Sequence, residues 1–90
     1  MKVTNIKVTL TNTPKVKAIV TIVIDNELEI SDIRIVEDNK RIIIAFPNRL
    51  NTKTGKFIDI AHPINSNTRN DFSDVIMKEY YRKKKLLQNI

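Results

Sequence analysis

Hydrophobic residues recur at every second position through the first half of the chain, which is the period of a β-strand. Ile6, Val8 and Leu10 alternate with polar residues and predict a first strand with one face in water. Residues 16–24 form a second run, whose alternating apolar set predicts a buried face: Val16, Ala18, Val20, Ile22 and Ile24. Ile19 and Val23 make the other face apolar as well, so we expect this strand to be central.

Turn residues divide the rest of this half into further strands. Asp25–Asn26 predicts a tight turn, and the strand after it changes from even to odd hydrophobic positions. That change predicts a β-bulge near Ser31–Asp32. A second turn at residues 38–40 leads to a strand over residues 41–46, which Pro47 ends. Residues 48–56 are interpreted as a polar loop, and the segment KFIDI after them as a short extended piece.

From Ser66 onward the hydrophobic period becomes that of a helix. The apolar stripe comprises Thr68, Phe72, Val75, Ile76 and Tyr80, and the opposite face carries Asp71, Asp74, Lys78, Arg82 and Lys85. We predict an amphipathic helix of four to five turns capped by Asn65 or Ser66. Residues 82–90 either complete this helix, with their cations at its negative end, or form a mobile basic tail. The fold class is therefore α+β: an antiparallel, strand-rich meander of four to five strands with one C-terminal helix.

Length and composition narrow the class of protein. Ninety residues make a single domain over residues 1–90 with one modest core. The absence of cysteine leaves neither a disulfide framework nor a thiolate metal site. The N-terminal segment has no continuous apolar block, so we expect neither a signal peptide nor a membrane span, and we expect a soluble cytoplasmic protein.

The net charge of +6 is unevenly distributed along the chain. Residues 1–24 carry four lysines and no acid, whereas residues 25–38 carry six acids against one arginine. Residues 39–60 and 61–90 are again basic. Cations concentrated in particular segments are typical of a polyanion-binding protein, although a basic surface that only aids solubility remains the alternative.

His62 and Arg69 are the residues of interest in the segment DIAHPINSNTR. Catalysis by His62 would need a nucleophile or base partner, and no convincing set is nearby, so we interpret it as a buried imidazole bonded to its own turn. Arg69 stands in the first helical turn, where a cation opposes the helix dipole. It is therefore either a phosphate ligand beside free backbone N–H groups or an ion-pair partner of Asp59 or Asp71.

The isoleucines indicate an interface. Ile42, Ile43 and Ile44 are consecutive, and with Ile19 and Val23 they make both faces of a central strand pair apolar. One C-terminal helix can cover only one face of such a sheet. Because large exposed apolar patches mark interfaces and twofold dimers are the commonest assemblies, we expect a homodimer with two equivalent basic surfaces.

Three segments carry a family resemblance: ISDIRIV from Ile30, AFPNR from Ala45 and DIAHPINSNTR from Asp59. In this order and spacing they resemble the stage V sporulation protein G family of small bacterial regulators, also labelled septation proteins, over nearly the whole chain. The resemblance implies a dimeric α+β protein that binds DNA and RNA to adjust gene expression, with effects on septation, sporulation or virulence. The family's basic helix region maps onto Thr68–Arg69 and the residues after them. This chain departs at residues 38–41, where family members often have a glycine-containing turn.

Two functional hypotheses follow. The first is a nucleic-acid-binding regulator whose contacts are Arg69, Thr68, Asn67, Arg49, Lys53, Lys56, Arg82, Lys83, Lys84 and Lys85. The second is a protein-interaction module that recruits a division or transcription partner through the acidic segment 25–38 and an apolar sheet edge. We expect no enzyme activity, catalytic residue, metal, cofactor, small-molecule substrate or membrane partner.

Overall fold

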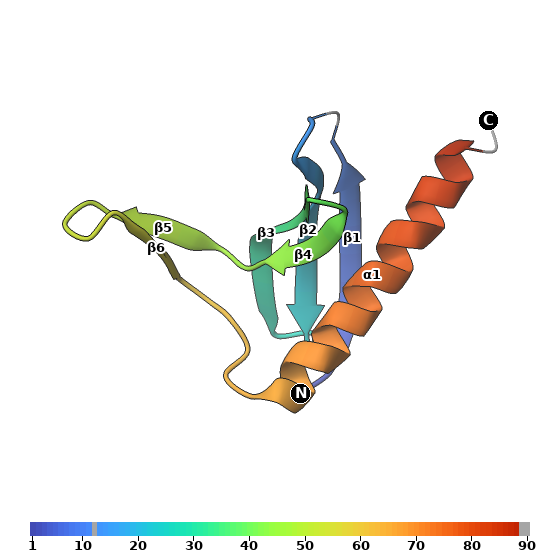
Figure 1. Ribbon diagram of the computed structural model, residues 1–90. Helices are drawn as coiled ribbons and strands as arrows, with labels where there is room; N and C mark the ends of the chain where they lie inside the picture. Colours follow the sequence, from blue (N-terminus) through green and yellow to red (C-terminus); the bar gives the residue numbers. More distant parts are fainter. Residues whose placement is uncertain (12, 89–90) are drawn as a thin grey trace.

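The computed structural model describes residues 1–11 and 13–88, in which the chain forms six strands and one helix (Figure 1). The elements are β1 (Val3–Leu10), β2 (Val16–Ile24), β3 (Leu28–Asp38), β4 (Arg41–Ala45), β5 (Asn48–Asn51), β6 (Lys56–Asp59) and α1 (Ser66–Gln88). All of the strand pairings are antiparallel. The predicted α+β class is therefore confirmed.

The four N-terminal strands form a meander in the order β1-β2-β3-β4. Because β2 lies between β1 and β3, the prediction of a central strand for residues 16–24 is confirmed. The bulge expected near Ser31–Asp32 is also present: the β2–β3 register shifts there, and Asp32 has a φ of 61°. The extra residue on β3 keeps Ile30 and Ile33 on the same face of the sheet although their numbers differ by three.

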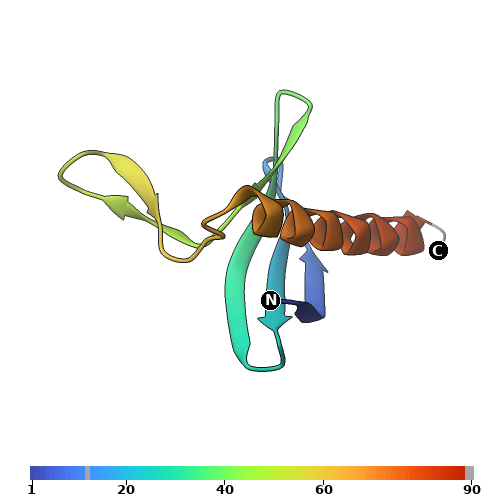
Figure 2. The same cartoon turned by 90° about the horizontal axis from the view of Figure 1, so that it is seen from below.

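Helix α1 crosses one face of this sheet (Figure 2). The core between them consists of Val8, Ala18, Val20, Ile22, Ile24, Ile33, Ile35, Phe46, Phe72, Ile76 and Tyr80. The predicted stripe residues Phe72, Ile76 and Tyr80 are buried, as expected from their helical spacing. Val75 is 38% exposed, so its assignment to the buried stripe was wrong. It lies about 100° around the helix from Ile76, which places it beside the sheet contact.

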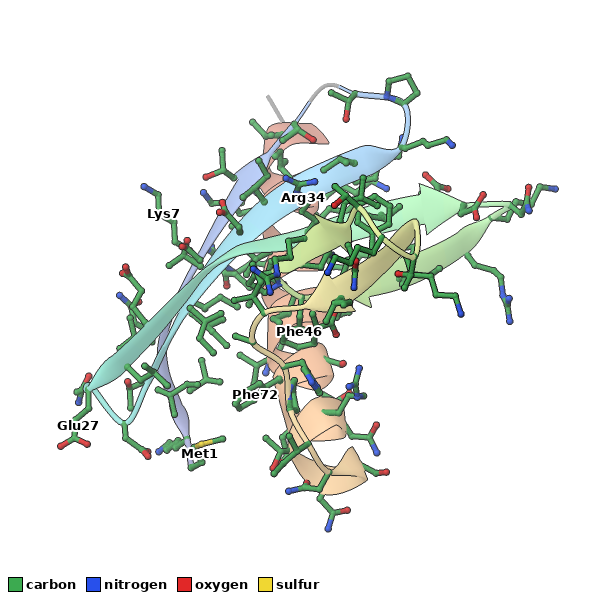
Figure 3. All side chains as sticks on the ribbon, turned by 90° about the vertical axis from the view of Figure 1, so that its left-hand side faces the viewer. Met1, Lys7, Glu27, Arg34, Phe46 and Phe72 are labelled. Atoms are coloured by element: carbon green, nitrogen blue, oxygen red, sulfur yellow. The ribbon has the colours of Figure 1, made fainter. Side chains whose placement is uncertain are left out.

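Within the described residues, no helix covers the second face of the sheet (Figure 3). Ile19 and Ile43 are 39% and 48% exposed there, and Lys7 and Arg34 lie on the same face by register. The expected apolar surface is therefore present but interrupted by cations. The expectation that β4 belongs to a central pair was wrong, because in the described residues β4 is an edge strand paired only with β3.

β5 and β6 form a separate hairpin that projects away from the sheet and from α1 (Figures 1 and 2). The interpretation of residues 48–56 as a polar loop was therefore wrong over Asn48–Asn51. This polar segment is a strand because it pairs with Phe57 and Ile58 on the neighbouring strand. The four residues of the segment alone do not indicate that pairing. Gly55, at a φ of 72°, closes the hairpin by donating its N–H to the Asn51 carbonyl at 2.8 Å.

The helix begins as predicted and runs further than predicted. The Asn65 side-chain oxygen accepts the Thr68 N–H at 2.7 Å, which identifies Asn65 as the N-terminal cap. The 23 residues of α1 make about six turns, compared with the four to five expected, and residues 82–88 belong to it. Residues 89–90 of the segment considered as a basic tail lie outside the described residues. In the part of the chain that the structure describes, no helix has the length and apolarity needed to cross a bilayer.

Candidate nucleic-acid interface

The β5–β6 hairpin carries three cations, spread from near its base at Arg49 to its turn at Lys53. Arg49, Lys53 and Lys56 are all exposed, and they outnumber the single hairpin carboxylate, Asp59. The salt bridges among the described residues are Lys17–Glu37 and Glu79–Arg82, so no hairpin cation has a carboxylate partner within 4.0 Å. These three charges are available to an external anion.

The register of the hairpin places Arg49 and Lys56 on one face and Leu50 and Phe57 on the other. Ile58 lies on the face of Arg49, and Asp59 lies on the face of Phe57. Arg49 pairs with Ile58 and Asn51 with Lys56, so these four side chains share one face. Leu50 pairs with Phe57 on the opposite face. The hairpin therefore has a basic face, which we define by Arg49 and Lys56, and an apolar face, which we define by Leu50 and Phe57.

Arg69 links the start of α1 to the end of β4. Its guanidinium carbon lies 5.8 Å from the centroid of the Phe46 ring, and its Nη2 donates to the Pro63 carbonyl at 3.2 Å. The ion pair with Asp59 or Asp71 that we considered is absent from the described residues. Arg69 is exposed, and a guanidinium has five N–H donors, so further donors remain for an anion.

At the helix start, fewer groups are free to bind a phosphate than the sequence predicted. Asn65 satisfies two backbone donors there: its side chain accepts the Thr68 N–H, and its carbonyl accepts the Arg69 N–H at 3.1 Å. Thr68 is half-buried, whereas Asn67 is exposed. The positive charge of Arg69 is therefore the main feature for an anion at this end, with Asn67 as a neighbouring polar group.

The run Arg82–Lys85 lies at the far end of α1, about 20 Å along the axis from Arg69. Four consecutive helical residues point in four directions, so this run does not form one surface. Arg82 Nε donates to both Glu79 carboxylate oxygens, at 3.1 and 3.0 Å. Lys84 Nζ lies 5.8 Å from the Tyr80 ring centroid, Lys83 is half-buried, and Lys85 is exposed.

The Arg82 guanidinium hydrogen-bonded to Glu79 lowers the pKa of that carboxyl, and Glu79 in turn raises the pKa of Arg82. Burial raises the pKa of Glu79 and so opposes the effect of Arg82, whereas the charge of Lys83 lowers it further. The pair is ionised at neutral pH, so Arg82 is largely neutralised by its own chain. Lys84 and Lys85 are left as the exposed cations of the run without a carboxylate partner in the described residues.

His62 is bonded to its own turn as predicted, because its Nδ1 lies 2.9 Å from the Pro63 carbonyl oxygen. The expectation that the ring is buried was wrong, since His62 is exposed and Pro63 is the buried residue of the pair. The described residues contain no cluster of three His, Asp or Glu side chains placed to hold a metal ion.

Sequence reasoning missed Phe46 and the apolar hairpin face. Phe46 is buried and supports Arg69, although 23 positions separate them, so no local pattern connects the two. Leu50 and Phe57 are 50% and 72% exposed, and their pairing follows only from the hairpin register. The isolated apolar residues among polar neighbours were the only available signal.

The SpoVG family model matches residues 1–82. The chain belongs to the SpoVG family. Similar relatives carry the name "Putative septation protein SpoVG". The relative from Thermoanaerobacter sp. strain X514 is 44% identical over 85 residues, covering 93% of this chain and 91% of the relative. The relative from Geobacillus thermodenitrificans is 41% identical over 91 residues, covering 100% and 94%. The SpoVG match includes the hairpin and the start of α1, and it ends at Arg82.

Proposed function

We propose that this SpoVG-family chain is a homodimeric regulator that binds DNA, and also RNA, through its exposed cations. The observation that carries the proposal is the β5–β6 hairpin, which presents Arg49, Lys53 and Lys56 without a carboxylate partner in the described residues. A projecting cationic hairpin suits a polymer of phosphates, because each phosphate that it neutralises releases condensed counterions.

The contacts fall into two groups. Arg49, Lys53, Lys56 and Arg69 provide the main charge, with Asn67 and Thr68 beside Arg69 as polar contacts to phosphate or sugar. Lys83, Lys84 and Lys85 contribute from the far end of α1, and Arg82 contributes when it leaves Glu79. Few of these side chains can read base edges, so the proposed binding depends weakly on sequence.

The cellular role that we propose is adjustment of gene expression in the cytoplasm, with consequences for septation and sporulation. Its support is the family membership and the septation name of the relatives. A homodimer would double the number of phosphate contacts, and its interface would cover apolar surface that a single copy exposes.

The test of the proposal compares the unchanged protein with Arg69→Ala and with the matched control Lys2→Ala, which removes a cation at the N-terminus of β1. Fluorescence anisotropy with duplex DNA and single-stranded RNA measures affinity, and light scattering after size exclusion measures the dimer. We expect Arg69→Ala to weaken binding by at least about fivefold, because a charge-assisted contact contributes about 1 kcal/mol or more. Lys2→Ala should remain close to the unchanged protein.

Each outcome has a defined meaning. Weakened binding by an intact Arg69→Ala dimer supports the proposal. An intact dimer that binds both polymers unchanged removes Arg69 from the interface. An unchanged protein that binds neither polymer overturns the proposal and favours the protein-interaction module, which would then be sought through loss of partner capture in variants of segment 25–38.

A further inference from the structure

The chain exposes more surface than a folded monomer of its size. Its solvent-accessible area is 6949 Å². A compact monomer of 10.4 kDa is expected to expose about 5,400 Å², so the excess is about 1,500 Å². A specific protein interface covers about 800 Å² on each partner. The excess is therefore large enough for one stable interface with a second copy.

Every residue of β5 and β6 except Asn51 is exposed. Leu50 and Phe57 together form the apolar face of the hairpin and are among the exposed large hydrophobic residues of the chain. A two-stranded hairpin is at best marginally stable alone in water. An apolar face on such a hairpin therefore indicates that another surface supports it.

A groove of matching chemistry lies between β4 and α1. Its volume is about 390 Å³, and it is lined by Ile42, Ile44 and Phe46 on one side and by Ser73, Met77 and Tyr81 on the other, with Arg69 at the Phe46 end. The outer edge of β4 beside it is unpaired within the described residues. An isoleucine-rich edge strand next to an apolar groove is a site for added polypeptide.

The hairpin does not cover the groove of its own chain. Only Phe46 and Pro47 separate β4 from β5, and the Ile60 N–H donates to the Pro47 carbonyl at 2.6 Å, which fixes the base of the hairpin. From this base the hairpin extends away from β4 and α1 (Figures 1 and 2). A second copy related by a twofold axis can supply a hairpin to each groove.

We propose that two copies exchange their β5–β6 hairpins as arms, and that the apolar face of each arm packs into the β4–α1 groove of the other copy. This inference rests on the homodimer of the proposed function and names its interface. With Leu50 and Phe57 buried, the basic face of the arm stays outside. The cations of one chain then lie beside Arg69 of the other, and both copies complete each anion-binding surface.

Cysteine cross-linking tests the arrangement, because the chain has no cysteine of its own. Leu50→Cys marks the apolar face of the arm and leaves Phe57 in place, and Ser73→Cys marks the groove with a near-isosteric change. The two variants are unfolded together, refolded as a mixture and treated with a short bis-maleimide. In this mixture, a link between positions 50 and 73 can form only between chains.

We expect a covalent dimer in which peptide mapping finds the 50–73 link. The control mixture pairs Ser73→Cys with Leu28→Cys, an exposed position at the start of β3, and should give no link above background. The variant Ile43→Cys is cross-linked alone to detect the rival arrangement. In that arrangement, the sheet faces opposite α1 from the two copies pack together. Leu50→Asp with an intact sheet and helix by circular dichroism should yield monomers.

The outcomes separate the arm exchange from the homodimer. A dimer by light scattering without the 50–73 link, or with a strong link at position 43, overturns the arm exchange and leaves the homodimer standing. A monomeric unchanged protein overturns both. A 50–73 link found within one chain of the doubly substituted Leu50→Cys/Ser73→Cys protein, migrating as a monomer, shows that the arm folds back and also overturns the exchange.

Discussion

Arg69 and Phe46 form a contact that joins the first turn of α1 to the end of β4, with the guanidinium carbon 5.8 Å from the ring centroid. The same guanidinium holds the Pro63 carbonyl, so one side chain fixes the entry of the chain into the helix. The planar group is suited to both contacts, whereas a lysine ammonium would keep only the charge.

Replacing Arg69 by lysine should therefore separate structure from charge. We expect Arg69→Lys to lower the free energy of unfolding by about 0.5–1 kcal/mol, the size of an exposed cation–π contact. Nucleic-acid affinity should fall less than in Arg69→Ala, because the positive charge is retained. Chemical denaturation and anisotropy measure the two effects. Equal loss of affinity in both variants would contradict the phosphate role and assign Arg69 to positioning.

The hairpin cations should determine how steeply binding depends on salt. Lys53→Gln and Lys56→Gln combined should reduce the slope of log affinity against log salt concentration by about 0.9 for each duplex phosphate that the variant no longer neutralises. Anisotropy titrations over a salt series measure this slope. The matched control is Lys2→Gln with Lys7→Gln, which removes the same charge from β1 and its N-terminal flank. A slope reduced equally by both pairs would show that only net charge matters.

Glu79 should restrain Arg82 from binding phosphate. Glu79→Gln removes the ion pair and frees the guanidinium, so affinity should rise about two- to fivefold at low salt. Asp74→Asn is the control, because it removes the same charge from α1 without releasing an arginine. Lowering the pH has the same effect only once it falls through the lowered pKa of Glu79, where the stability from the pair is also lost. An equal rise in affinity in both variants would exclude a specific role for Arg82.

The turn between β3 and β4 contains a strained lysine. Lys40 has a φ of 68°, in the left-handed region that favours glycine. Lys40→Gly should raise the free energy of unfolding by about 1 kcal/mol. Lys40→Ala is the matched control, because it removes the charge and keeps the steric conflict. Thermal unfolding measures both, and a similar change in the two variants would contradict the backbone explanation.

The sequence was sufficient for the main sheet and the helix because their periodicities are long and regular. The bulge at Asp32 followed from a shift between even and odd hydrophobic positions, and the cap at Asn65 followed from its side-chain chemistry. These features depend on residues that are close together in the chain.

The remaining features depend on contacts between distant residues. β5 is a strand because Leu50 meets Phe57, and Arg69 is held because Phe46 comes beneath it. The sequence also did not show which of the candidate phosphate contacts lie together in space. The structure places them at three separate sites: the hairpin, the start of α1 and the far end of α1. The pairing of Arg82 with Glu79 further reduced the charge expected from residues 82–85.

Binding of the unchanged protein to duplex DNA and to single-stranded RNA at two salt concentrations tests the account most directly. The three cations of each hairpin would give two copies contacts to six phosphates. We therefore expect the affinity for the duplex to fall about a thousandfold between roughly 50 and 200 mM salt. No binding to either polymer at the lower salt, or an affinity that is the same at both, would contradict the account.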